Sequence, residues 1–127
     1  MATGLENLKI YKMAEDLKLE VFELTKLFPK DEKFRSVDQL RRSSSSVSKN
    51  IAESYNKGSV KEKIHILRGI AKSEAEETKR NLTVCLKKRF HSNEILIDKY
   101  TELIKAISGY IRFLKLKSEQ RERNLRT

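Results

Sequence analysis

The feature that most constrains the fold is the spacing of the apolar residues, which recur at every third or fourth position in four successive stretches. This spacing puts side chains on one face of an α-helix, whereas a half-buried β-strand would show strict alternation. The 127-residue chain has one proline and four glycines, so little in it interrupts a helix. The sequence therefore predicts an all-α fold built from long helices.

The apolar stripes also give approximate helix bounds. The first stripe runs from Ile10 to Phe28, and Pro29 ends it because proline disfavours helical dihedral angles in the residue before it. The second stripe begins at Val37 and continues to about residue 55. Together the stripes predict helices over about residues 5–28, 60–89 and 94–117, with one more helix between the first two.

Two features inside these stripes are unusual for helices. The second stripe passes through four consecutive serines, residues 43–46, a composition typical of flexible linkers. Because the period continues through the serines, we expect a helix whose small side chains let a neighbouring backbone approach closely. Gly69 lies inside the third predicted helix, where glycine costs about 1 kcal/mol relative to alanine, and we expect it to mark a tight helix crossing.

Four amphipathic helices with short connections favour an up-down-up-down antiparallel four-helix bundle. We expect one domain over residues 1–117, followed by a basic, frayed tail over residues 118–127. The third and fourth predicted helices each carry a second apolar row, and an exposed apolar face of that extent is a liability for a monomer. The sequence therefore predicts a homo-oligomer.

The charge of the chain is strongly positive and unevenly distributed. Lysine and arginine number 28 against 18 acidic residues, which gives a net charge of +10. Residues 35–60 contribute +3, residues 61–91 contribute +5 and residues 115–127 contribute +3, whereas residues 1–30 and 92–114, which hold most of the first and fourth predicted helices, are neutral. Such a surface would attract a polyanion, and nucleic acid bound mainly through its phosphates is the obvious candidate.

The residues predicted to contact nucleic acid, RNA or DNA, come from the densest basic clusters. For any single one of these residues, the alternative interpretation is that it complements a helix dipole and keeps the surface soluble. The candidates are Lys72, Lys79, Arg80, Lys87, Lys88, Arg89, Arg121 and Arg123.

One carboxylate cluster lies on the third predicted helix, where Glu74 takes a position at which the stripe expects an apolar residue. A carboxylate there needs a partner, and Arg41 and Arg42 are the natural candidates. We expect a structural polar network, not an enzyme site, because no nucleophile, positioned histidine or metal partner accompanies these groups. The expected network consists of Arg41, Arg42, Asn50, Glu53, Glu74 and Glu77.

Several other classes of site are excluded or disfavoured. Cys85 is the only cysteine, so an internal disulfide or a multi-thiolate metal site cannot form, and its place on an apolar stripe indicates a small core residue. No metal and no cofactor is expected. No apolar run approaches the length that spans a bilayer, and the N-terminus lacks a secretory pattern, which predicts a cytoplasmic protein with no membrane contact.

The second predicted helix carries a recognisable pattern: Gln39-Leu40-Arg41-Arg42, then Ser46-Val47, then Asn50-Ile51-Ala52-Glu53. It resembles the four-helix-bundle proteins named after ribosomal-RNA intervening sequences, and the resemblance covers about residues 5–115. Further matches are Leu27-Phe28-Pro29, Glu32-Lys33-Phe34 and Ile70-Ala71-Lys72-Ser73-Glu74. The chain has Ser54 where that family usually has glycine and Ser43 where it often has alanine.

This resemblance implies a homopentamer of four-helix bundles with no known catalytic activity. The chain is also similar to the accessory variability determinant proteins of diversity-generating retroelements, basic pentamers that bind a reverse transcriptase and its template RNA. The expected function is a non-catalytic, homo-oligomeric nucleic-acid-binding scaffold that docks onto a partner such as a reverse transcriptase. The alternative is a protein-interaction module whose basic surface meets an acidic partner and no nucleic acid.

Overall fold

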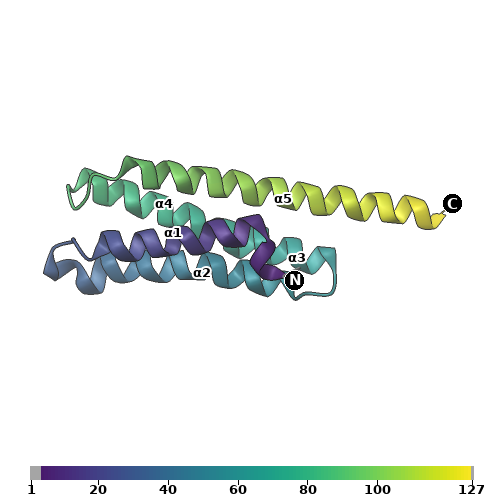
Figure 1. The fold of residues 1–127 in the computed structure, drawn as a ribbon, viewed down its shortest axis with the longest axis horizontal. Coiled ribbons are helices and arrows are strands. Elements are labelled where there is room, and N and C mark those ends of the chain that lie inside the picture. The colour runs from purple at the N-terminus through teal and green to yellow at the C-terminus, as the bar shows by residue number, and fades with distance from the viewer. Residues whose placement is uncertain (1–3, 127) are drawn as a thin grey trace.

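The computed structural model describes residues 4–126, and most of them are helical (Figure 1). The helices are α1 (Lys9–Thr25), α2 (Asp38–Tyr55), α3 (Val60–Ile66), α4 (Lys72–Lys87) and α5 (Glu94–Arg126). A π-helical turn, Leu67–Ala71, joins α3 to α4 with helical dihedral angles on both sides. These three pieces form one long third helix, so the chain makes four helical rods, and the predicted all-α helical bundle is confirmed.

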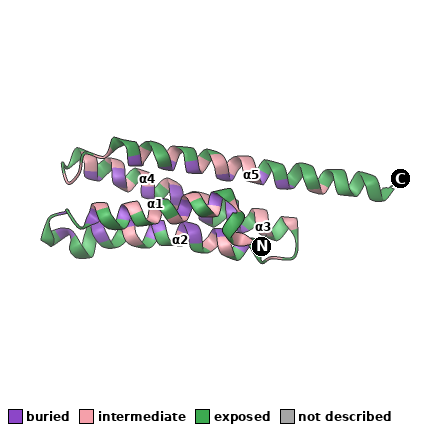
Figure 2. Ribbon diagram, in the orientation of Figure 1, coloured by how far each residue is buried: buried purple, intermediate pink, exposed green. Residues whose placement is uncertain are grey.

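The four rods surround a common core. α1 packs against α2 and α5, and α4 packs against the same two helices. The predicted stripes face inward: Ile10, Ala14, Leu17 and Val21 of α1 are buried, as are Leu96, Tyr100, Leu103 and Ile107 of α5. Figure 2 shows the buried residues along the inner faces of the rods. The 3–4 spacing of the apolar residues therefore accounts for the packing.

The helix through the serines is confirmed, because α2 continues without a break from Asp38 to Tyr55. The buried serines satisfy their hydroxyls locally: Ser44 donates to the Arg41 carbonyl at 3.2 Å, and Ser54 donates to the Ile51 carbonyl at 2.7 Å. Ser43 Oγ lies 2.7 Å from Thr78 Oγ1 of α4, within hydrogen-bonding distance. These small side chains let α2 and α4 approach closely.

Gly69 does not mark a tight crossing, and that prediction was wrong. The residue is exposed in the π-helical turn, and a Cβ added there would meet no atom within 4 Å among the described residues. The close approach of the third helix to α2 is made instead by Thr78, one of the small residues nearer the middle of α4. The side of the third helix that carries Gly69 faces open space.

The predicted tail is corrected, because residues 118–126 continue α5 as a regular helix. Residues 115–126 contain no glycine or proline and consist largely of lysine, arginine, glutamate, glutamine and leucine, which favour helix. Beyond Leu114 this part of α5 buries no residue, and Figures 1 and 2 show it extending past the end of the bundle. Thr127 lies outside the described residues, as do residues 1–3.

Candidate nucleic-acid interface

A groove runs between the third helix and α5, and we call it the basic groove. It consists of three hollows that follow one another in the same order along both helices. The lysines and arginines that line it are Lys57, Lys61, Arg68, Lys72, Lys79 and Arg80 on the third helix and the residues before it, and Lys105, Arg112 and Lys115 on α5. The carboxylates that line it are Glu62, Glu76 and Glu119.

The central hollow, of about 190 Å³, is the most strongly charged part of the groove. Arg68 and Lys72 line it from the third helix, and Arg112 and Lys115 line it from α5. The other lining residues are Ser108 and Ile111, so four cations share this hollow with no carboxylate. Within one helix the pairs are four and three residues apart, which places each pair on a single face. We call this the four-cation hollow.

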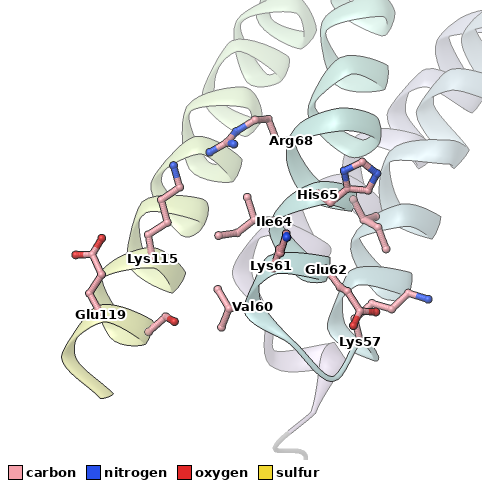
Figure 3. A pocket seen from close by; sticks show the side chains of 11 residues that line it. Lys57, Val60, Lys61, Glu62, Ile64, His65, Arg68, Lys115 and Glu119 are labelled. Atoms are coloured by element: carbon pink, nitrogen blue, oxygen red, sulfur yellow. The ribbon is translucent and has the colours of Figure 1, made fainter. Parts of the chain in front are cut away.

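The first hollow, of about 970 Å³, lies between α3 and the C-terminal part of α5. Figure 3 shows Val60 and Ile64 on the α3 side of this space, with Arg68 and Lys115 pointing toward each other across its edge. Both cations also line the four-cation hollow, so the two hollows adjoin. The floor of the first hollow is therefore apolar where it meets the cationic centre of the groove.

The third hollow, of about 620 Å³, lies further along α4 and α5. Val84 and Ile104 give it an apolar floor, and Lys79, Arg80 and Lys105 stand around that floor. Val84 is 46% exposed although it is apolar. An apolar hollow thus lies on each side of the four-cation hollow.

The cations of the groove are almost all unpaired within the chain. Of the nine lysines and arginines that line the groove, only Lys105 makes an ion pair with a described residue, Glu102, at 3.6 Å. Several lysines on the α1 side of the molecule are neutralised locally: Lys26 Nζ lies 3.1 Å from Glu23 Oε1, and Lys99 Nζ lies 3.2 Å from Glu20 Oε1. The groove differs from that side in that its unpaired cations face one another across a shared hollow, which raises the local positive potential.

The predicted nucleic-acid residues fall in three places along these two helices. Lys72, Lys79 and Arg80 line the basic groove. The cluster at residues 87–89 is exposed at the end of α4, and Arg121 and Arg123 are exposed on the part of α5 that extends past the bundle. The structure thus brings three of the eight candidates to the groove.

Sequence reasoning missed Arg68, Arg112 and Lys115, which line the four-cation hollow with Lys72. Arg112 lies in residues 92–114, which are neutral by count, and Lys115 lies in residues 115–127, where the prediction falls on Arg121 and Arg123 instead. The sequence positions of all four cations of this hollow carried a usable signal. Arg68 and Lys72 lie on one face of the third helix, and Arg112 and Lys115 lie on one face of α5, so the two pairs can meet when these antiparallel neighbours pack.

The six residues of the expected polar network are not brought together. Arg41 points to α1, where its Nε donates to Thr25 Oγ1 at 2.9 Å and its guanidinium lies 4.4 Å from the Phe22 ring centroid. Arg42 pairs instead with Asp38, at 3.5 Å and largely in solvent. The expected pairing of Glu74 with either arginine is therefore not present.

The other members of that set are local or unpaired. Asn50 donates to the Ser46 carbonyl at 2.8 Å within α2. No ion pair joins Glu53, Glu74 or Glu77 to another described residue. Partial burial, and secondly the charge of Glu77, raise the pKa of Glu74. The polar contact between α2 and α4 is made by Ser43 and Thr78, which leaves Glu53 and Glu77 exposed and Glu74 half-buried.

Cys85 is buried, as its place on the stripe predicted, and burial raises the pKa of its thiol. His91 has both ring nitrogens occupied: Nε2 lies 2.8 Å from the Leu82 carbonyl and Nδ1 accepts from the Asn93 N–H at 3.0 Å. Across residues 4–126 no three histidine, cysteine or acidic side chains gather as metal ligands. None of the described helices is long and apolar enough to cross a bilayer.

The arrangement of the fold and groove can now be compared with known proteins. The family model described as 23S rRNA-intervening sequence protein matches residues 6–109. The chain belongs to this family. The match ends within α5, before Arg112 and Lys115, so it contains part of the basic groove and not all of it.

A solved structure agrees with the fold of this family member. It is described as a protein of unknown function from the S23 ribosomal protein family of Bacteroides thetaiotaomicron VPI-5482. Its TM-score is 0.73 at 24% sequence identity, over 80% of this chain and 97% of that chain. Comparison with curated proteins gives no match.

Proposed function

We propose that this chain is a non-catalytic, homo-oligomeric scaffold that binds nucleic acid, RNA or DNA, through the basic groove. The observation that carries the proposal is the four-cation hollow, where Arg68, Lys72, Arg112 and Lys115 share one small space without a carboxylate. Like charges held close together repel, and an anion between them removes that cost. Arginine and lysine are the side chains that bind phosphate best.

The position of these cations supports binding over a merely structural role. A basic residue complements the helix dipole only in the last turn. Arg68 and Lys72 lie near the middle of the long third helix, and Arg112 lies far from the end of α5. Dipole compensation therefore does not account for the four-cation hollow, whereas phosphate binding does.

The assembly belongs to the same proposal. The resemblance described above implies an up-down-up-down bundle assembled as a homopentamer, and large exposed apolar residues offer surface for self-association: Leu19, Leu27, Phe34 and Ile95 are all at least 60% exposed. Repeating the groove around a ring would multiply its attraction for a polyanion. Sedimentation velocity that shows a monomer at micromolar concentration would contradict this part.

A cytoplasmic role as the accessory protein of a retroelement reverse transcriptase is the more specific form of the proposal. It rests on the similarity to accessory variability determinant proteins and on the basic groove, which suits a template RNA. Co-purification of the chain with the reverse transcriptase encoded beside its gene tests this form. A gene with no reverse transcriptase in its neighbourhood would leave only the general scaffold role.

Fluorescence anisotropy with labelled RNA and single-stranded DNA tests binding itself. We expect affinity that falls steeply as salt rises, because phosphate contacts release counterions. The triple variant Arg68→Glu, Lys72→Glu and Arg112→Glu should lose about 100-fold or more in affinity. The matched control carries the same charge change on exposed, unpaired lysines elsewhere: Lys9→Glu, Lys12→Glu and Lys30→Glu.

The control variant should retain affinity to within about fivefold, because its lysines lie outside the basic groove. Equal losses in both variants would mean that net charge alone binds the polyanion. Absence of binding at low salt, together with tight binding to an acidic protein, would replace the proposal with the protein-interaction module.

A further inference from the structure

The basic groove has a second property besides its charge, which is the order of its surfaces. On the third helix the apolar residue Ile64 comes first, then the cations Arg68 and Lys72, then the apolar residue Val84. α5 runs in the opposite chain direction: its Lys115 and Arg112 line the four-cation hollow, and its Ile104 lines the third hollow beside Val84. The residues that α5 contributes to the first hollow are polar, so the apolar floor there comes from Val60 and Ile64. A cationic centre is thus flanked on both sides by apolar floors.

From this order, and resting on the proposed function, we propose that the groove binds single-stranded nucleic acid. The phosphates of the strand lie in the four-cation hollow, and unpaired bases lie against the apolar floors on either side. From Ile64 to Val84 the third helix spans roughly 30 Å at 1.5 Å per residue, enough for several nucleotides of one strand.

A duplex would use only part of this surface. In a duplex the bases stack inside and the phosphates face outward, so a duplex could meet the cations while Val84 and the exposed parts of the half-buried Val60, Ile64 and Ile104 stayed in water. A single strand offers both groups at once, and covering an apolar floor with a base removes apolar area from water. This proposal explains why Val84 is exposed on the floor of the third hollow, with cations around it.

The size and lining of the first hollow also fit a single strand. The part of α5 that carries Lys115 and Glu119 stands apart from α3, and Figure 3 shows the side chains of Val60 and Ile64 in the space between. The hollow holds about 970 Å³, which is room for bases as well as for a backbone. Lys57, Lys61, Arg68 and Lys115 are its cations, so a phosphate can be met at either end.

The test compares three ligands with equal total numbers of phosphates: a labelled single strand, a duplex of half that length, and an abasic strand with the same backbone as the single strand. We expect the single strand to bind about tenfold more tightly than either of the others at moderate salt. The abasic strand isolates the contribution of the bases, because it retains every phosphate.

The failures of the two proposals are distinguishable in this experiment. Equal affinity for all three ligands overturns the single-strand inference and leaves the proposed function standing. Tighter binding of the duplex also overturns it. No binding of any ligand at low salt overturns the proposed function and this inference together.

A variant locates the bases. Val84→Asn keeps the charge of the third hollow and makes its floor polar, and we expect it to weaken single-strand binding about fivefold while leaving abasic binding unchanged. Ile70→Asn is the matched control, since Ile70 is 40% exposed in the π-helical turn and lines none of the three hollows. An equal effect of both substitutions, or an equal loss of abasic binding, contradicts the assignment.

A fluorescence reporter keeps the test decisive if Val84→Asn alters folding. The chain contains no tryptophan, so Val84→Trp introduces a single indole into the groove, and Ile70→Trp introduces one outside it. We expect the indole at position 84 to be quenched on addition of the single strand and not on addition of the abasic strand. Quenching that is the same at both positions would overturn the proposal.

Discussion

The two flanks of α5 differ in whether their cations are paired with carboxylates. On the flank that faces α1, Lys99 Nζ lies 3.2 Å from both carboxylate oxygens of Glu20. On the flank that faces the third helix, Arg112 and Lys115 meet Arg68 and Lys72, and none of these four forms an ion pair within residues 4–126. One helix therefore presents a neutralised edge and an unneutralised edge.

This difference shows why charge counted along the chain is a weak guide to a binding surface. By count, residues 92–114 are neutral, yet they supply Lys105 and Arg112 to the basic groove. The carboxylates that balance the count lie elsewhere on the helix, for example Glu102, which pairs with Lys105 at 3.6 Å. What distinguishes the groove is the absence of a facing carboxylate at its centre.

Placing a carboxylate in the four-cation hollow should neutralise the flank of α5 that faces the third helix, as Glu20 neutralises Lys99 on the flank that faces α1. Ser108 lines the hollow and precedes Arg112 by four residues, a favourable spacing for an acidic residue and an arginine. Ser108→Glu should lower nucleic-acid affinity about thirtyfold, because the carboxylate takes the place of a phosphate. The same substitution should raise the free energy of unfolding by about 0.5 kcal/mol.

Ser108→Gln is the matched control, with nearly the same size and no charge. It should leave affinity within about twofold of the wild type, and urea denaturation should show no gain in stability. If Ser108→Glu raised stability without lowering affinity, the four-cation hollow would not be a nucleic-acid-binding site, which would contradict the prediction.

The flank that faces α1 should respond in stability and not in binding. The hydroxyl of Tyr100 is buried and has no hydrogen-bond partner among the described residues. Tyr100→Phe removes that unsatisfied group and should raise the free energy of unfolding by about 1 kcal/mol at pH 7. Tyr55→Phe, at a partly exposed side chain, should change it by less than about 0.5 kcal/mol.

The same residue gives a pH dependence. Burial, and secondly the charge of Glu20, raise the pKa of Tyr100 above its ordinary value near 10. The unfolded chain then loses this proton at lower pH than the folded chain, so stability falls as pH rises above about 10. Urea denaturation across this range should show a wider gap between Tyr100→Phe and wild type at higher pH. A gap that narrows would contradict the assignment.

Much of the fold could be predicted from the sequence, because burial follows helical periodicity. Leu40, Val47 and Ile51 are buried at spacings of seven and four residues, and the period identified α2 as helix despite its serines. The errors share a cause. Gly69 and Glu74 were assigned partners from their positions on one helix, whereas the side of a helix that meets a neighbour depends on how the helices pack.

The basic groove could be predicted only in part for the same reason. Lys72, Lys79 and Arg80 stood out because they belong to a segment with a positive sum. Arg112 and Lys115 lie on α5, and only packing of α5 against the third helix brings them to Arg68 and Lys72. A sum over a segment cannot register a pairing between segments.

The loop that joins α4 to α5 offers a smaller test of where the binding surface ends. Arg89 has a φ of 64°, and the Arg89 and Phe90 N–H groups donate to the Leu86 and Cys85 carbonyls, which is the Schellman arrangement. Glycine adopts this conformation without strain, so Arg89→Gly should stabilise the fold by about 0.7 kcal/mol.

Arg89→Ala removes the same charge without that conformational freedom, and its stability should match the wild type. Because Arg89 lies beyond the basic groove, both variants should lose less than about threefold in nucleic-acid affinity. A tenfold loss in both, measured by anisotropy, would extend the binding surface to the end of α4.

The smallest expected effect comes from breaking the ion pair on the α1 flank. Glu20→Gln frees Lys99, whose side chain is 49% exposed, and surface pairs of this kind contribute little, so the free energy of unfolding should fall by about 0.3 kcal/mol. Nucleic-acid affinity should rise by less than about twofold, since the freed cation has no other cation facing it across a hollow. The affinities of Glu20→Gln and Ser108→Glu, both measured by anisotropy, can be compared directly, because each substitution changes the net charge of the chain by one unit. If freeing Lys99 strengthened binding as much as Ser108→Glu weakened it, the polyanion would be responding to net charge alone, and the unpaired centre of the groove would have no special role.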